Sequence, residues 1–150
     1  GYGESADAYH MTTPDPSGAG AVLAMRRALG DAGNPDIDYV NAHGTGTQLN
    51  DAMESAAIKT VFGGNIMPPV SSIKPMLGHL LGGAGAVEAA VSLFAIRNKF
   101  LPPNLNYRTP DPACDLNVIA EGRSCQVTTV LSNSFGFGGS NAALVIREAR

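Results

Sequence analysis

The sequence of 150 residues is poor in charge and contains no tryptophan. Charged residues make up 15% of the chain and the formal net charge is -3, so the clustered lysine and arginine that phosphate contacts require are missing. We therefore expect no nucleic-acid partner. A hydrophobic content of 44% also argues against a disordered chain.

Cysteine is scarce, and long apolar runs are absent. Cys114 and Cys125 follow no C-x-x-C pattern, which excludes a disulfide framework and a cysteine-based zinc site and favours a reducing, cytoplasmic compartment. The longest nearly apolar run, residues 84–96, contains Glu88 and Ser92 and is shorter than the ~20 residues that cross a bilayer. We expect a buried helix there and no membrane contact.

The start of the chain has no initiator methionine, no basic segment and no apolar segment. We therefore expect no signal peptide, and we interpret the sequence as a fragment of a longer chain. Its length is that of one domain or of part of one.

Glycine is the one clear excess, with 18 residues. Half of them fall in three short segments: HGTGT at 43–47, GHLLGGAG at 78–85 and FGFGG at 135–139. Clustered glycines mark places where the backbone turns sharply or approaches another group closely. Neither a dinucleotide-binding nor a phosphate-loop spacing is present.

Helical and strand periodicities alternate between these segments. They predict helices over 18–32, 51–62 and 82–98, and strands over 37–42, 67–72, 116–120, 127–133 and 141–147. Asp51 and Glu54 have capping-box spacing at the start of the second helix, and FGFGG joins the last two strands as a hairpin. No repeat or long linker divides the chain. The pattern predicts an α/β fold in which helices cover a mostly buried sheet.

Two of the three histidines stand beside glycine-rich turns. His43 directly follows a predicted strand, and His79 lies in the second glycine segment, so each can offer a ring nitrogen to a cleft. A single such histidine is more often structural, but two in one short chain favour a shared site. No third ligand stands one helical turn from either histidine, which argues against a metal centre.

Two threonines and two phenylalanines also lie in the glycine-rich turns. Thr45 and Thr47 alternate with glycines, so their hydroxyls can face one side of the turn and bind an amide; Thr47 could instead cap the next helix. Phe135 and Phe137 could fill the core or could form a movable gate over a pocket.

A lysine and a glutamate complete the candidate constellation. Lys74 lies in a rigid loop five residues before His79, where its charge would help keep that imidazole neutral; a solvated lysine is the alternative. Glu88 sits in an otherwise apolar helix and needs a buried partner, for which Lys74 is a candidate.

Three motifs together resemble the β-ketoacyl synthases, in particular the C-terminal half of the synthase II type. They are NAHGTGT at 41–47, SIKPMLGHLLGGAG at 72–85 and NSFGFGGSN at 133–141. The resemblance covers the whole chain and implies a thiolase-like fold, in which two similar α/β halves form a layered αβαβα architecture. Residues 1–150 would be the C-terminal half-domain.

The resemblance also implies an activity: the decarboxylative Claisen condensation of malonyl-acyl carrier protein with an acyl thioester, as in fatty acid elongation. His43 and His79 would be the catalytic histidines, with Lys74 ordering His79 and its surroundings. Thr45 and Thr47 would hold the phosphopantetheine arm.

Further residues receive roles by the same resemblance. Phe137 would gate the acyl pocket and supply a backbone N–H to an oxyanion hole, with Phe135 and Gly138 beside the substrate. Glu54 and Glu88 would form a network with Lys74. A structural monovalent cation would be held by Asn41, Glu88, Ser132 and Asn133.

The expected partners are acyl carrier protein, malonyl and acyl thioesters and, in the full-length enzyme, a second copy of the chain. No cofactor is expected, since phosphopantetheine arrives on the carrier protein. Acidic carrier proteins meet basic patches, for which the candidates are Arg26, Arg27, Arg97 and Lys99.

One family motif is missing, namely the nucleophilic cysteine in a DTACS-type elbow. Cys114 and Cys125 lie in a loop and before a strand, and no helix follows either of them to lower the thiol pKa. We expect that half of the enzyme to be absent and the 150 residues alone to be inactive.

Several alternatives stay open at this point. Gly46 completes HGTGT, which is common in polyketide ketosynthases. A non-catalytic chain-length partner subunit is disfavoured because His43, His79 and Lys74 are all present. A degradative thiolase is disfavoured because its C-x-G motif is missing. An unrelated α/β ligand-binding module is the last possibility.

Overall fold

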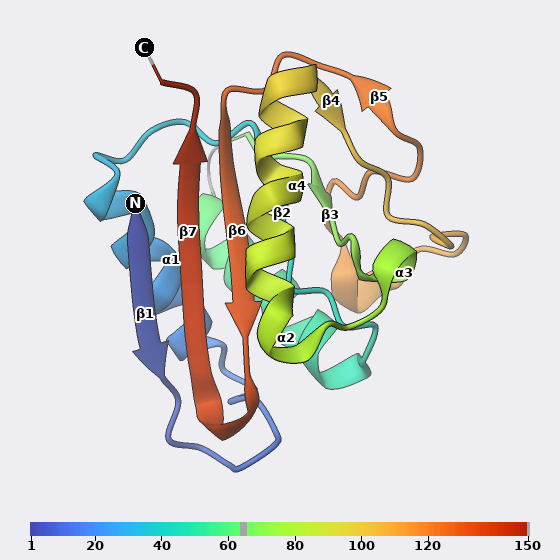
Figure 1. Cartoon of the computed structure of the whole chain (residues 1–150). Helices are drawn as coiled ribbons and strands as arrows, with labels where there is room; N and C mark the ends of the chain where they lie inside the picture. The colour runs from blue at the N-terminus through green and yellow to red at the C-terminus, as the bar shows by residue number, and fades with distance from the viewer. Residues whose placement is uncertain (64–65, 150) are drawn as a thin grey trace.

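Five strands form one mixed sheet in the computed structural model, which describes residues 1–63 and 66–149 (Figure 1). Their order is β1-β7-β6-β2-β3, and their bounds are β1 (Tyr2–Ala6), β2 (Tyr39–Asn41), β3 (Val70–Ser71), β6 (Thr129–Phe135) and β7 (Ser140–Arg147). β6, β2 and β3 are parallel, while β7 runs antiparallel to both β1 and β6. A separate hairpin-like pair joins β4 (Phe100–Leu101) to β5 (Arg123–Ser124).

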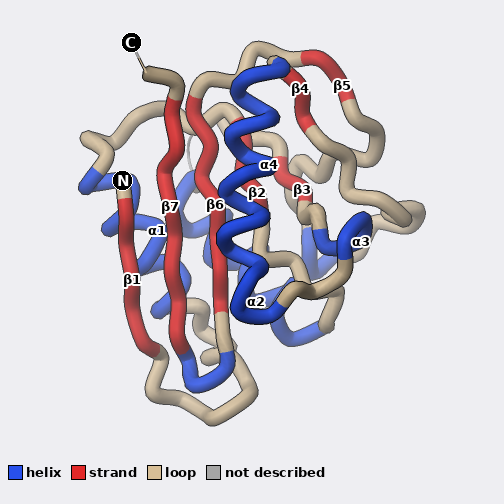
Figure 2. Tube along the Cα trace, viewed as in Figure 1, coloured by secondary structure: helices blue, strands red, loops and turns tan. Residues whose placement is uncertain are grey.

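Helices cover both faces of the main sheet. α1 (Ala19–Asp31) and α2 (Gln48–Phe62) lie behind it in the view of Figures 1 and 2, and α4 (Ala84–Asn98) crosses in front. The short α3 (Lys74–Leu77) follows β3, and single 3-10 turns occupy Leu81–Gly83, Pro112–Cys114 and Phe137–Gly139. The chain is therefore an α/β layer structure, as its periodicities predict.

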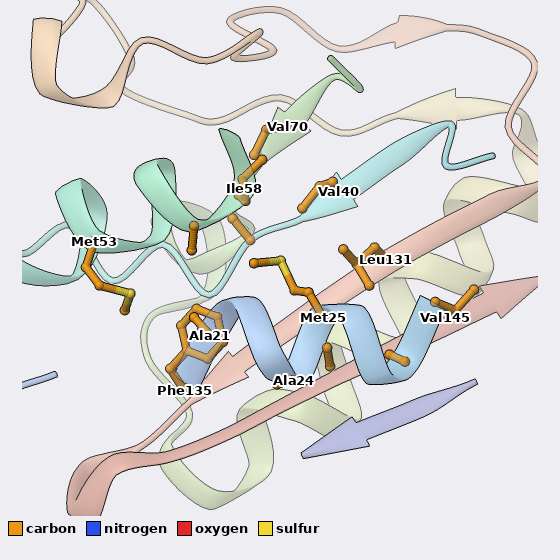
Figure 3. Packing of buried hydrophobic residues seen from close by; sticks show 14 residues of the cluster. Ala21, Ala24, Met25, Val40, Met53, Ile58, Val70, Leu131, Phe135 and Val145 are labelled. Carbon is orange, nitrogen blue, oxygen red and sulfur yellow. The ribbon is translucent and has the colours of Figure 1, made fainter. Parts of the chain in front are cut away.

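The side-chain alternation of the central strands divides the core in two. Val40 and Leu131 face α1 and α2, where Met25 reaches toward them (Figure 3). Tyr39 and Val130 face the opposite way and pack under α4. Because both faces are covered, β6 is buried almost throughout, which is typical of a central strand between helical layers.

The predicted elements other than the strand over 116–120 are present, with corrections at their ends. α2 begins at Gln48 because the Thr47 hydroxyl accepts the Asn50 N–H at 3.3 Å; the expected capping box of Asp51 and Glu54 is therefore wrong. The segment 116–120 forms only a single bridge, Val70 to Val118, instead of a strand. No sequence pattern predicts β1, which is short and polar and exists through its pairing with β7.

Only one side of the helix α4 is buried, and its uncovered side is apolar. Glu88 and Ser92 lie on the buried side, whereas Leu93 and Phe94 are 55% and 59% exposed. The expectation of a buried helix is thus half fulfilled, and α4 leaves an uncovered apolar face. Among the described residues, no helix is long and apolar enough to span a membrane.

Candidate active site

His43 is placed by the sharp turn that links β2 to α2. Gly44 adopts a left-handed φ of 43°, and a Cβ added to it would stand 2.5 Å from the Cβ of Ser72. Glycine is therefore required at this position for two independent reasons. The turn presses close to the end of β3 and holds the imidazole, which is almost fully buried, at the end of the sheet.

The buried carboxylate of Glu54 anchors this turn from α2. It accepts the backbone N–H of His43 at 2.9 Å and that of Gly44 at 2.8 Å, and the side-chain amide of Asn133 at 3.1 Å. Burial raises the pKa of Glu54, while these hydrogen bonds and the Lys74 charge oppose the rise. The expected network of Glu54 with Lys74 needs correction: among the described residues Glu54 makes no hydrogen bond to Lys74 and is joined to it through His43, whose N–H it accepts.

Lys74 is the buried cation of the site. Its ammonium pairs with the Glu88 carboxylate and donates to the main-chain carbonyl of His43; its Nζ also lies 3.3 Å from Nδ1 of His43. The predicted pairing of Lys74 with Glu88 is confirmed. The expectation that Lys74 orders His79 needs correction, because the hydrogen bonds of Lys74 go to His43, which the turn brings closer.

These contacts determine the protonation state of His43. A lysine ammonium has donors only, so Nδ1 of His43 must accept its hydrogen bond and the ring proton must sit on Nε2. Burial, with the nearby charges of Lys74 and His79, lowers the pKa of His43 to about 3. The folded state therefore binds fewer protons than the unfolded one, and the free energy of unfolding falls as the pH drops from about 6.5 toward 3.

Nδ1 of His79 also accepts a hydrogen bond, but from a different donor. The backbone N–H of Leu81 donates to its Nδ1 at 3.1 Å, which leaves the proton of a neutral ring on Nε2. The two imidazoles are edge to face, with centroids 5.5 Å apart. The two rings thus lie together beyond the carboxyl ends of the neighbouring parallel strands β2 and β3, which is where open α/β sheets bind ligands.

The FGFGG turn separates its two phenylalanines. Phe135 is buried with its ring 5.7 Å from that of His43, whereas Phe137 is 80% exposed. The backbone N–H of Gly136 donates to the Ser140 carbonyl, and that of Gly138 donates to the Met11 carbonyl, both at 2.7 Å. No such hydrogen bond from the Phe137 N–H is present among the described residues. Phe135 therefore fills the core, and Phe137 offers a free side chain and a free N–H. Nothing in the sequence pattern indicated the Met11 contact.

The hydroxyls of Thr45 and Thr47 lie 3.0 Å apart on the same side of the turn. Thr47 also caps α2, which confirms the capping interpretation, while the binding of an amide stays a prediction. Neither cysteine is followed by a helix: Cys114 ends a 3-10 turn, and Cys125 follows β5.

Buried oxygens without partners occur at Asn41 and Asn133, whose Oδ1 atoms have no hydrogen bond among the described residues. The Asn41 amide donates to the Glu88 carbonyl at 3.2 Å and to Ser132 at 3.5 Å, on the α4 side of the sheet. The Asn133 amide contacts Glu54 on the other side. An orphaned oxygen beside a carboxylate fits a hard monovalent cation. No group of three His, Cys, Asp or Glu that could hold a metal occurs in the described parts of the chain.

Residues 1–108 match the model of the β-ketoacyl synthase C-terminal domain. The chain belongs to the β-ketoacyl synthase family. It is 49% identical over 150 residues to 3-oxoacyl-[acyl-carrier-protein] synthase 2 of Coxiella burnetii, covering 97% of this chain and 36% of that protein. The synthase 2 of Synechocystis is 46% identical over 152 residues, which cover 99% of this chain and 36% of that protein. The chain thus spans little more than a third of the length of these curated relatives.

Solved structures of β-ketoacyl synthases share the fold. A β-ketoacyl synthase from Burkholderia phymatum superposes with a TM-score of 0.92 at 41% identity, covering 100% of this chain and 37% of that one. The ishigamide ketosynthase/chain length factor gives a TM-score of 0.95 at 42% identity, with 100% and 37% coverage. The thiolase-like fold predicted from the three motifs is therefore confirmed.

Replacing Lys74 tests the buried ion pair. We expect Lys74→Met to lower the free energy of unfolding by about 3–5 kcal/mol, because it leaves the Glu88 carboxylate buried without a cation. The double variant Lys74→Met/Glu88→Leu should recover most of this loss. Urea unfolding of the protein that contains this chain measures both values.

Lys59→Met is the matched control. Lys59 forms an exposed pair with Asp115 at 3.5 Å, which is worth less than about 1 kcal/mol. Equal losses for the two single lysine variants, or no recovery in the double variant, would show that the Lys74 pair is not a buried structural unit.

Proposed function

We propose that this chain is the C-terminal part of a β-ketoacyl-[acyl-carrier-protein] synthase that lengthens acyl chains by decarboxylative condensation. One observation carries the proposal: Nδ1 of His43 and of His79 each accepts a hydrogen bond, which leaves Nε2–H as the ring donor of each, and the two ring centroids are 5.5 Å apart. The relatives named 3-oxoacyl-[acyl-carrier-protein] synthase 2 support it.

The reaction needs two such donors on one oxygen. When the malonyl thioester loses carbon dioxide, the electron pair of the broken C–C bond becomes an enolate and negative charge collects on the thioester oxygen. Donors fixed before the reaction stabilise that charge without reorganisation. The enolate carbon then attacks the carbonyl carbon of the acyl thioester, a new C–C bond forms, and the thiolate leaves.

The neutral state of His43 is essential to this role. An imidazolium could also donate, but Lys74 and burial make that state unfavourable, as the lowered pKa shows. Lys74 is a positioning residue: it holds the ring through Nδ1 and the main chain through the His43 carbonyl. Glu54 holds the same turn from the other side.

The remaining roles follow from position. The adjacent hydroxyls of Thr45 and Thr47 would bind the amides of the phosphopantetheine arm. The unused N–H of Phe137 would contribute to the oxyanion hole of acyl transfer, and its exposed ring would gate the acyl pocket, with Phe135 and Gly138 beside it.

Acyl carrier protein is the proposed partner, and it brings phosphopantetheine, so the chain needs no cofactor of its own. A similar structure, described as a type II PKS acyl-carrier protein in complex with its ketosynthase, supports this partner. The uncovered apolar face of α4 is where we place the missing part of the protein, which would carry the nucleophilic cysteine. We also propose that the full-length enzyme forms a homodimer.

A structural monovalent cation would be held near Asn41, Glu88 and Ser132, where it would satisfy the orphaned Asn41 oxygen. Asn133 faces Glu54 on the other side of the sheet, so the structure does not bring it to this site. If the cation is bound there, potassium in place of a bulky organic cation should raise the unfolding midpoint of the full-length protein. The Asn41→Leu variant should lose that dependence. An equal dependence in both proteins would refute the site.

A polyketide ketosynthase is the second candidate function. Gly46 and the similarity to the ishigamide ketosynthase/chain length factor favour it. Both candidates use the same two histidines, so the following experiment serves either.

Replacing the histidines tests the decarboxylation step. We expect His43→Ala and His79→Ala, each in the full-length protein, to slow carbon dioxide release from malonyl-acyl carrier protein by ~10²–10³-fold, because each removes one donor to the enolate oxygen. Loading of the acyl group onto the nucleophile should change far less. Asn98→Ala, exposed at the far end of α4, is the control and should leave both rates unchanged.

The isolated 150-residue chain should release no carbon dioxide and should regain activity when combined with the cysteine-bearing part. Rapid decarboxylation by either histidine variant, or condensation by the isolated chain, would overturn the proposal.

A further inference from the structure

Two carboxylates from the first two turns of α2 hold the backbone of the turn after β2. Glu54 accepts the N–H groups of His43 and Gly44, at 2.9 and 2.8 Å. Asp51 accepts the N–H of Gly46 at 3.2 Å. Residues three apart in a helix are neighbours on one face, so these two like charges repel each other. The turn therefore depends on a pair of anions that needs a hydrogen-bond donor beside it.

The side-chain amide of Asn50 is that donor. Its Nδ2 lies 3.1 Å from Oδ1 of Asp51 and 3.4 Å from Oε2 of Glu54, and the residue is only 7% exposed. The amide nitrogen must face the carboxylates, because these accept hydrogen bonds and its NH₂ group has two hydrogens to donate. This buried position thus calls for an uncharged group with two donors.

The main chain of Asn50 joins the same network. Its backbone N–H donates to the Thr47 hydroxyl at 3.3 Å, and that hydroxyl lies 3.0 Å from the hydroxyl of Thr45. Asn50 therefore contacts both the carboxylates that hold the turn and the threonine that ends it.

Asp51 depends on Asn50 more than Glu54 does. Among the described residues, the Asp51 carboxylate accepts hydrogen bonds from Gly46 and Asn50 and from no other group. Glu54 has a further donor, the side-chain amide of Asn133 at 3.1 Å. Loss of the Asn50 amide should therefore loosen the Gly46 end of the turn first.

The charges that surround the Asn50 amide are mainly negative. Asp51 and Glu54 face it from α2, and the charge of Lys74 acts on Glu54 from α3. Burial raises the pKa of Glu54, while its hydrogen bonds and the Lys74 charge lower it. A third carboxyl group at position 50 would have two anions beside it, which would raise its own pKa.

We propose that Asn50 is a positioning residue for the condensation, because its amide holds Asp51 and Glu54 together and so fixes the turn that carries the catalytic histidine and the two threonines. This inference rests on the proposed function, in which the threonine hydroxyls bind the phosphopantetheine arm. Since the Gly46 end of the turn depends most on Asn50, the residue acts chiefly on the binding of malonyl-acyl carrier protein.

The pH profile of Asn50→Asp in the full-length protein tests this role. Above the pKa of the new carboxyl group three anions repel one another, and below it the protonated group can donate one hydrogen bond again. We expect the KM for malonyl-acyl carrier protein in decarboxylation to be at least about tenfold above that of the unmodified protein at pH 8.5 and within about threefold of it at pH 6. The kcat should change less than the KM at both pH values.

Gln48→Glu is the matched control, because it makes the same change from amide to carboxylate in the first turn of α2 on an exposed side chain. It should keep the KM and the pH profile of the unmodified protein. Asn50→Ala removes the donor without adding a charge, so its KM should rise about threefold or more at both pH values. This variant decides if Asn50→Asp fails to fold.

Hydrogen exchange of the turn is a readout that does not depend on activity. Mass spectrometry of a peptide that spans residues 43–50 should show faster exchange in both Asn50 variants and unchanged exchange in Gln48→Glu. If the unmodified protein released no carbon dioxide, the proposed function would fail, while exchange would still decide whether Asn50 holds the turn. Unchanged exchange in the Asn50 variants, or a loss of stability without the expected rise in KM, would contradict the positioning role.

Discussion

The candidate active site depends on one buried ammonium. Lys74 satisfies Glu88, the His43 carbonyl and Nδ1 of His43 at once, so it joins α3, α4 and the end of β2. Burying a charge is unfavourable unless it is paired and hydrogen-bonded, and here each partner also needs the ammonium. The same ammonium sets which nitrogen of His43 carries the proton. Fold and chemistry therefore share a single interaction.

The second constraint is the backbone of the turn after β2. Gly44 allows the chain to pass against Ser72. The Glu54 carboxylate accepts hydrogen bonds from the N–H groups of His43 and Gly44, which have no strand or helix partners in the sharp turn. His79 is oriented in a simpler way, by one backbone N–H two residues along. The His43 ring is thus held in a buried network and the His79 ring by its own loop. In both rings Nδ1 accepts the hydrogen bond and Nε2 carries the proton.

Much of this arrangement could be predicted from the sequence because the signals are local. Glycine-rich turns indicate the positions of His43 and His79, and helical spacing predicts α1, α2 and α4. The apolar context of Glu88 requires a buried partner, for which Lys74 is a candidate. Other features depend on distant contacts that no local pattern encodes: the pairing of β1 with β7, the preference of Lys74 for His43 over His79, and the tie between Gly138 and Met11. The earlier start of α2 reflects a competition between Thr47 and Asp51 that spacing alone does not decide.

The central claim is that both histidines carry their ring proton on Nε2 and accept a hydrogen bond at Nδ1. Nitrogen-15 NMR of the histidine rings in the full-length protein at pH 7 tests it directly, because protonated and unprotonated ring nitrogens resonate far apart. The account predicts a protonated Nε2 and an unprotonated Nδ1 for both His43 and His79, with His43 unchanged from pH 5 to pH 8. A proton on Nδ1 of either ring, or an imidazolium at His43 in this range, would contradict it.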